Sequence, residues 1–419
     1  MDDIGTTERD TSEAAPGPIY LDCAAHTPLD ARVLASMVRT ELECLGNPHS
    51  TAHAHGRKAR DAVEAARREL ALTLGAEPGQ LLFTSGATES NNLALLGTCR
   101  AGTEGVVTCT TEHASVLEPL AWLERQGTSV VRVPVDAHGR LDPERLLAAV
   151  RPETRLVSLM WVNNELGTIH PIAELAAALR ERGVLFHVDA AQAFGRVPIG
   201  LADGCIDLMT ISAHKAGGPA GVGALFVRDP ARLLPRLRGG GQEAGLRSGS
   251  LPTALCVGFG VIAAVLREEL EADAVRLAKA TTWLRAQLGQ RAGPLRFFTP
   301  PTQAAPGILC VGFEGVAAED VMALVSDDLA ISAGSACTTG SGKPSHVLEA
   351  LPVPPELRRS ALRLSPGRRT TDAELARTVE ILAAAVELLR RLGPRSAEAR
   401  GLPDRITLTA PTGAPSLAT

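Results

Sequence analysis

Residues 184–192, VLFHVDAAQ, and residues 207–215, DLMTISAHK, decide the fold. Each stretch opens with an apolar run of the length of a buried strand and closes on polar side chains. Strands that are apolar throughout are typical of parallel sheets covered by helices on both faces. The pair therefore predicts two strands of a parallel sheet, with Asp189 and Lys215 at the carboxyl ends.

The same pattern continues on both sides of this pair. Buried strands are predicted at 105–111 (GVVTCTT), 155–162 (RLVSLMWV) and 223–228 (GALFVR), and amphipathic helices at 56–74 and 171–182. Because strands and helices alternate, the sequence predicts an α/β domain with a mainly parallel sheet.

The pattern changes at about residue 265, where long Ala/Leu/Arg helices flank short strand-like runs. We therefore predict a large α/β domain at residues 18–264 and a smaller α/β domain at 265–395. Residues 1–17 and 396–419 are rich in Pro, Ser, Thr, Gly and Ala and have few large apolar side chains. Such composition predicts disordered tails, since little burial offsets the entropy lost on ordering.

Composition excludes several classes of protein. The chain has 419 residues, 45% of them hydrophobic, and a net charge of −5 with scattered basic residues, so nucleic acid is not an expected partner. Since no apolar run reaches the roughly 18 residues of a membrane span and the start, MDDIGTTERD, is acidic, we expect a cytoplasmic protein. Eight cysteines without a CxxC pair argue against a disulfide framework and a zinc site.

Polar clusters directly follow five predicted strands, the first of which is LLF at 81–83. The clusters are TSGATESNN (84–92), TEH (111–113), NNELG (163–167), DAAQ (189–192) and SAHK (212–215). In open parallel sheets ligands bind beyond the carboxyl ends of the strands, so these clusters are predicted to meet at one site.

Ten strings together carry a resemblance to a known family. They are IYLDCAAHTP, LGNPHS, FTSGATESNN, TEH, VNNELG, HVDAAQ, SAHK, GGGQEAGLRSGS, SAGSACTT and LRLSPGRRTT. In this order they resemble the NifS/IscS-like cysteine desulfurases, a branch of the class V aminotransferase group, over about residues 19–395. The resemblance implies the type I fold of pyridoxal-phosphate (PLP) transferases with a sheet of the seven-stranded type, and a homodimer with active sites at the interface. It also implies L-cysteine as substrate and a sulfur-acceptor protein as partner.

Lys215 is the central residue of the predicted site, because PLP chemistry needs a lysine amine that bonds to the cofactor and moves protons. Considered alone, a lysine at a strand end is more often a solvated charge. Asp189 matches the family's partner of the pyridine nitrogen, and its alternative role is a helix N-cap.

The phosphate of the cofactor is predicted to bind at the helix that opens with SGATES. A helix N-terminus offers unpaired N–H groups to an anion, so Ala87 and Thr88 are assigned there, although such a start is also good capping. By resemblance Ser212 and His214 add phosphate contacts. Ser250 stands where the family has a threonine that reaches the neighbouring subunit's phosphate.

The remaining pocket residues are assigned by resemblance. His113 matches the histidine that stacks on the PLP ring and assists proton transfer. Asn164 and Gln192 match side chains that hydrogen-bond the cofactor's phenolic oxygen, and Asn164 also contacts substrate. Arg363 matches the residue that clamps the substrate carboxylate, with a surface ion pair as its alternative role.

Cys337 decides the chemistry. It lies in SAGSACTTGSGKPSHVL, a Gly/Ser/Thr-rich segment without apolar periodicity, which predicts a loop. Most cysteines of cytosolic proteins are small buried residues, and Cys99, Cys109, Cys205, Cys256 and Cys310 fit that pattern. Cys337 matches the family's sulfur acceptor, so its thiolate is predicted to attack the sulfur of L-cysteine and leave a persulfide and alanine.

The chain also departs from the family pattern. Gly217 replaces an aromatic residue and Ala220 a basic one, Gln242 replaces a histidine, Ala244 an arginine, and His26 a threonine. These changes affect the pocket wall and the dimer contact, and none removes a residue that the mechanism requires.

Three other functions compete with this interpretation: a selenocysteine lyase, a non-catalytic scaffold that keeps the fold to hold a sulfur-assembly partner, and an aminotransferase or β-lyase without the thiol. The destination of the sulfur stays open between iron-sulfur clusters, tRNA thiolation, DNA phosphorothioation and a natural product.

Overall fold

A central seven-stranded sheet organises the protein in the computed structural model, which describes residues 17–334 and 345–393. Its strands are β2 (Leu81–Thr84), β3 (Gly105–Cys109), β4 (Val130–Val133), β5 (Thr154–Met160), β6 (Leu185–Asp189), β7 (Leu208–Ser212) and β8 (Gly223–Val227). Their order across the sheet is β2-β8-β7-β6-β5-β3-β4. The strands expected from the sequence are confirmed.

Strand direction brings the polar clusters to one edge. The pairs β4/β3, β3/β5, β5/β6 and β6/β7 are parallel, whereas β8 is antiparallel to both of its neighbours, β7 and β2. Hence β2 runs in the same direction as β7, and only β8 is reversed among the seven strands. The carboxyl ends of the other six strands share one edge, as the mainly parallel sheet predicted.

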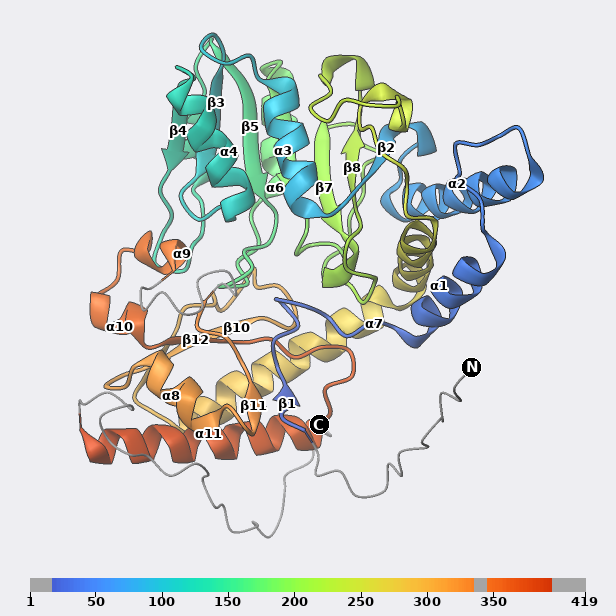
Figure 1. The fold of residues 1–419 in the computed structure, drawn as a ribbon. Helices are drawn as coiled ribbons and strands as arrows, with labels where there is room; N and C mark the ends of the chain where they lie inside the picture. The colour runs from blue at the N-terminus through green and yellow to red at the C-terminus, as the bar shows by residue number, and fades with distance from the viewer. Residues whose placement is uncertain (1–16, 335–344, 394–419) are drawn as a thin grey trace, which may run out of the picture.

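Helices cover both faces of this sheet (Figure 1). They are α1 (Ala31–Glu43), α2 (Ala54–Leu74), α3 (Ala87–Thr98), α4 (Ala114–Arg125), α5 (Pro143–Ala149) and α6 (Ile172–Glu181). Along β6 the side chains alternate between two cores: Phe186 and Val188 join one hydrophobic cluster, and Leu185 joins the other. A strand buried on both faces has no polar side, which explains the continuous apolar run in the sequence.

A second, three-stranded sheet lies apart from the first and has its own core (Figure 1). It is formed by β9 (Leu295–Phe297), β10 (Leu309–Phe313) and β12 (Ala361–Leu364), with the helices α8 (Ala318–Val325), α9 (His346–Glu349), α10 (Pro355–Arg359) and α11 (Asp372–Leu392). The N-terminal strand β1 (Ile19–Tyr20) pairs in parallel with β11 (Leu329–Ala330). The first described segment therefore packs beside the C-terminal half of the chain.

The long helix α7 (Thr253–Arg291) connects the two halves. Leu266 belongs to the core of the large sheet, and Leu284 and Leu288 belong to the core beside the small sheet. The predicted boundary at residues 264/265 lies inside this helix, and the division into two domains stays a prediction. Within 17–334 and 345–393, no helix combines the length and the apolar character needed to cross a membrane.

Two glycines of α7 allow a matched test of its packing. A Cβ on Gly260 would lie 2.6 Å from the Cα of Ala66 on α2, whereas a Cβ on the exposed Gly289 would meet nothing within 4 Å. We expect Gly260→Ala to destabilise the protein by about 1–3 kcal/mol, because backbone blocks the added methyl group. Gly289→Ala is expected to stabilise it by about 0.5–1 kcal/mol through helix propensity. Thermal unfolding midpoints that move in the same direction for both variants would contradict this packing.

Candidate active site

A cavity of about 460 Å³ lies at the shared carboxyl edge of the large sheet. Its wall contains nine of the residues predicted from the sequence: Ala87, Thr88, His113, Asn164, Asp189, Gln192, His214, Lys215 and Arg363. They come from segments that lie up to 276 residues apart in the chain, between Ala87 and Arg363. The prediction that the polar clusters meet at one site is therefore consistent with the geometry.

Three predicted residues stand outside this wall. Ser212 is fully buried behind it, and its hydroxyl lies 3.0 Å from Nδ1 of His214. Ser250 is exposed in the single chain, and its assignment to a neighbouring subunit's site stays a prediction. Cys337 lies outside the described residues, so its role stays a prediction.

Lys215 ends the short turn Ala213–Lys215 that follows β7. Its Nζ donates to the carbonyl oxygens of Ala24 and Ala25, each at 2.8 Å, and Gln192 Nε2 also donates to the Ala24 carbonyl, at 2.7 Å. The segment around Ala24 therefore covers the lysine. The sequence does not predict a role for Ala24 and Ala25, because alanines contribute there only through backbone carbonyls.

Asp189 ends β6 and is 5% exposed. Its Oδ1 accepts from the Ala191 amide at 3.0 Å, and its Oδ2 accepts from Nδ2 of Asn91 on α3 at 2.8 Å. The residues after Asp189 form turns rather than a helix, so the alternative role as a helix N-cap is wrong. Two N–H donors from different elements hold the carboxylate at the cavity.

His113 is the N-cap of α4 and accepts the Ser115 amide at its Nδ1 atom, at 3.1 Å. Burial lowers the pKa of His113, the charges of Lys215 and His346 lower it further, and Asp189 opposes the shift. The imidazole is therefore predominantly neutral at pH 7, the form that can exchange a proton with a bound molecule.

The N-terminus of α3 opens onto the cavity through Ala87 and Thr88. The first amides of a helix have no intrahelical partner, and a Cβ on the preceding Gly86 would meet nothing within 4 Å, so the space in front of them is open. Glu89 also lines the wall, and its carboxylate is paired with Arg247 at 2.7 Å. This pairing offsets the negative charge that would otherwise repel an anion.

His214 and His26 stack beside this helix end, with ring centroids 5.7 Å apart. Burial, together with the charges of Lys215 and His26, lowers the pKa of His214 to about 4. His214 is therefore neutral at pH 7 and contributes hydrogen bonds rather than a charge. His26, the departure from the family's threonine, adds a third imidazole to the cavity wall, beside those of His113 and His214.

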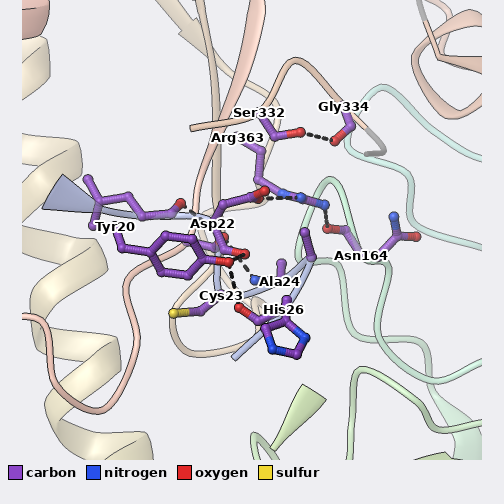
Figure 2. Close-up of polar contacts among 12 residues, drawn as sticks. Tyr20, Asp22, Cys23, Ala24, His26, Asn164, Ser332, Gly334 and Arg363 are labelled. Carbon is purple, nitrogen blue, oxygen red and sulfur yellow. Dashed lines mark hydrogen bonds and ion pairs between the residues drawn. The ribbon is translucent and has the colours of Figure 1, made fainter. Parts of the chain in front are cut away.

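Arg363 is 1% exposed and joins the two halves of the protein (Figure 2). From β12 its Nη2 pairs with Asp22 at 2.7 Å, and its Nη1 donates to the Asn164 carbonyl at 2.8 Å. The alternative of a surface ion pair is wrong, because the Arg363 side chain is buried and Asp22 is only partly exposed. Within the described part of the chain, Nε of Arg363 is buried and has no hydrogen-bond partner, so the guanidinium is not saturated by its contacts with Asp22 and Asn164.

The two ends of the segment 335–344 meet at Glu165, the residue after Asn164. The hydroxyl of Ser345 donates to Oε2 of Glu165, and a Cβ on Gly334 would lie 3.0 Å from the same oxygen. Figure 2 shows Gly334 close to Arg363 and Asn164, and the Ser332 hydroxyl donates a hydrogen bond to the Gly334 carbonyl oxygen. The segment that contains Cys337 therefore leaves and rejoins the described structure beside the cavity.

Backbone conformation accounts for part of the departures from the family pattern. Gly217 has φ of +93°, a conformation in which an aromatic side chain would be strained. Ala220 lines the cavity with a methyl group, so no basic side chain is present at that point. Gln242 uses its carboxamide oxygen to accept the Gly249 amide at 2.8 Å, and Ala244 has φ of +55°.

The residues present fit pyridoxal phosphate. A lysine amine, a carboxylate held by two donors and an open helix N-terminus are the groups that bind its aldehyde, ring nitrogen and phosphate. In addition, Oε1 of Gln192 is buried and has no partner among the residues that the structure describes, so the wall contains a polar atom that a ligand can satisfy.

The fold and site thus define an α/β protein with a cofactor pocket at the carboxyl edge of its sheet. The chain belongs to the aminotransferase class-V family, whose model matches residues 19–377. It is similar to cysteine desulfurase IscS of Anaeromyxobacter dehalogenans, with 44% identity over 382 residues, 90% of this chain and 94% of that protein.

Solved structures agree with this assignment. A NifS-like protein superposes with a TM-score of 0.82 at 32% identity, covering 88% of this chain and all of that chain. SspA in complex with cysteine superposes with a TM-score of 0.73 at 35% identity, covering 84% of this chain and all of that chain. The family and the type of fold predicted from the sequence are confirmed.

A single substitution can distinguish the predicted role of the Asp189 charge in cofactor binding from the hydrogen bond of Asp189 within its own turn. Asp189→Asn keeps an oxygen for the Ala191 amide but removes the negative charge, so the fold is expected to persist while PLP binds at least about tenfold more weakly. Equilibrium titration of the cofactor-free protein with PLP, followed by absorbance, measures this. Equal affinity of Asp189→Asn and the unmutated protein would reduce Asp189 to a turn residue.

Proposed function

We propose that this protein is a PLP-dependent cysteine desulfurase, which converts L-cysteine to L-alanine and passes the sulfur, as a persulfide on Cys337, to an acceptor protein. The observation that carries the proposal is the meeting of Lys215, Asp189 and the N-terminus of α3 in one cavity, beside the two ends of the segment that contains Cys337. The similarity to proteins named cysteine desulfurase supports the same activity.

Lys215 and Asp189 would hold the cofactor. When bound, PLP supplies an electron sink that makes the bonds at the substrate's α- and β-carbons easier to break. Lys215 must first leave the Ala24 and Ala25 carbonyls, and its amine then serves to move a proton at the substrate's α-carbon. Asp189 stays fixed by its two N–H donors while charge develops at the cavity.

Arg363 and Asn164 would orient the substrate. The Arg363 guanidinium is held by Asp22 and the Asn164 carbonyl, so its position is set before a carboxylate arrives. Neutral His113 is placed on the wall to exchange a proton with the bound molecule. Ala87, Thr88, Ser212 and His214 are assigned to the phosphate, and Gln192 to the phenolic oxygen.

The sulfur step assigned to Cys337 is balanced without another reactant. Its thiolate forms an S–S bond to the sulfur of L-cysteine as the bond between that sulfur and the β-carbon breaks. The electron pair of the broken bond remains with the carbon skeleton, which takes up protons and leaves as alanine. Chain connectivity supports this role: Cys337 is the third residue after Gly334, so its Cα can lie at most about 11 Å from a point beside the cavity wall.

The proposal extends to a cytoplasmic homodimer. Ser250 is exposed in the single chain and would contact the phosphate of the neighbouring subunit. The acceptor is expected to be a protein that receives the persulfide sulfur from Cys337.

Lys215 tests the cofactor assignment. Lys215→Ala removes the amine that bonds to the cofactor and moves protons, so both turnover of L-cysteine and the absorbance of the lysine-bound cofactor are expected to disappear. Circular dichroism serves as the control that the variant is folded. An active Lys215→Ala protein would rule out the PLP assignment.

Cys337 tests the sulfur step. Cys337→Ser keeps the size of the side chain but presents a hydroxyl that is not ionised near neutral pH, so alanine release from L-cysteine is expected to fall by orders of magnitude while PLP still binds. Alanine assay and mass spectrometry of the loop peptide, with and without L-cysteine, measure the two results. Wild-type alanine release from Cys337→Ser would refute the persulfide route.

Selenocysteine provides the second arm of that experiment. Selenium can leave without a protein thiol, so a Cys337→Ser variant that is inactive on cysteine yet fully active on selenocysteine would favour a selenocysteine lyase.

A further inference from the structure

A chain of hydrogen bonds connects Asp189 to His113 through two residues that have no role in the proposal above. Nδ2 of Asn91 lies 2.8 Å from Oδ2 of Asp189 and 2.8 Å from Oγ of Ser115. Oγ of Ser115 lies 2.8 Å from Nδ1 of His113. The chain crosses from β6 to α3 and then to α4, so three elements of the fold take part.

Counting hydrogens shows which group donates in each hydrogen bond of this series. The two hydrogens of the Asn91 amide are both used, one toward the Asp189 carboxylate and one toward the Ser115 oxygen. Because Ser115 accepts from Asn91, its own hydroxyl hydrogen is free to point to His113. The Ser115 backbone amide donates to the same nitrogen, Nδ1 of His113, at 3.1 Å.

His113 therefore has two donors directed at Nδ1. A nitrogen that accepts two hydrogen bonds carries no hydrogen, so the ring hydrogen must be on Nε2. The charged or titratable groups that act on this ring are Asp189 on β6, Lys215 after β7 and His346 on α9. None of these replaces the two donors from Ser115.

Burial of Asn91 and Ser115 stabilises this series of hydrogen bonds. Asn91 is 0% exposed and Ser115 is 7% exposed, so water does not compete for these groups. Oδ1 of Asn91 is buried without a partner within residues 17–334 and 345–393, so the orientation of the amide is set by its two donated bonds.

We propose that Asn91 and Ser115 are positioning residues of this active site, which together orient the Asp189 carboxylate and hold His113 as the neutral tautomer with hydrogen on Nε2. The Ser115 backbone amide makes Nδ1 an acceptor, so the Ser115 hydroxyl is the donor, and Asn91 occupies one lone pair of the Ser115 oxygen and thereby favours this orientation. The use of this tautomer in catalysis rests on the proposed function, whereas the tautomer itself does not.

The test measures His113 directly. Histidine ring ¹⁵N NMR is recorded as a function of pH on the full-length protein, with PLP bound and after its removal, and His113→Gln assigns the resonance. In the unmutated protein we expect the Nε2–H tautomer. Ser115→Ala removes one donor to Nδ1, so the pKa of His113 is expected to rise by about 0.5–1 pH unit.

Asn91→Leu tests the directional part of the proposal. Without the amide, the Ser115 oxygen can accept a hydrogen from protonated Nδ1, so the pKa of His113 is expected to rise although Ser115 is intact. The single variant Ser115→Thr keeps the hydroxyl, so the pKa of His113 in it is expected to equal that of the unmutated protein, in contrast to Ser115→Ala. Should Asn91→Leu fail to fold, as judged by circular dichroism, the Ser115→Ala and Ser115→Thr pair decides alone.

Ser158→Ala is a matched control. Its hydroxyl lies 2.8 Å from Nδ1 of the fully buried His187, so its removal is expected to shift the His187 resonances and not those of His113. An unchanged tautomer and pKa of His113 in Ser115→Ala, in spectra where Ser158→Ala does shift His187, would overturn the proposal. Because no L-cysteine is used, that outcome is distinct from a failure of the desulfurase activity.

Discussion

The parallel alignment of β5, β6 and β7 is the constraint on which the rest of the structure depends. It brings the ends of three apolar strands to one edge, so that Asn164, Asp189 and Lys215 line the same cavity. The strands can be apolar throughout because helices cover both faces of the sheet. The backbone polar groups of each strand form hydrogen bonds with neighbouring strands. Chemistry is therefore confined to the strand ends, where the chain leaves the sheet.

The buried guanidinium of Arg363 connects this edge to the smaller sheet. Arg363 reaches from β12 to Asp22 and to the backbone of Asn164, and loss of Asp22 would leave the buried guanidinium without its carboxylate partner. Glu165 extends the connection, because Ser345 and Gly334 both lie against its carboxyl group. Burial raises the pKa of Glu165, so its neutral form is favoured relative to an exposed carboxyl. The Arg363 guanidinium, Glu165 and the residues on either side of the segment 335–344 thus form one continuous polar region.

The neutral imidazoles follow from the same burial. His113 and His214 both have lowered pKa values, with burial as the main cause and Lys215 as a further cause. Two of the three imidazoles on the cavity wall are therefore neutral at pH 7 and offer hydrogen bonds rather than charge.

Local sequence was sufficient for the strands, for the polar clusters that follow them and for the residue types of the site, because apolar runs and the residues after them are local properties of the chain. The contacts of Lys215 with Ala24 and Ala25 were not predictable, since they use backbone carbonyls from a segment about 190 residues away. The same holds for the burial of Arg363 and for the path from Asp189 through Asn91 and Ser115 to His113. By itself, the sequence determined which groups stand at the strand ends. Only the tertiary structure decided which groups contact one another, because distances between separate elements depend on how the whole chain packs.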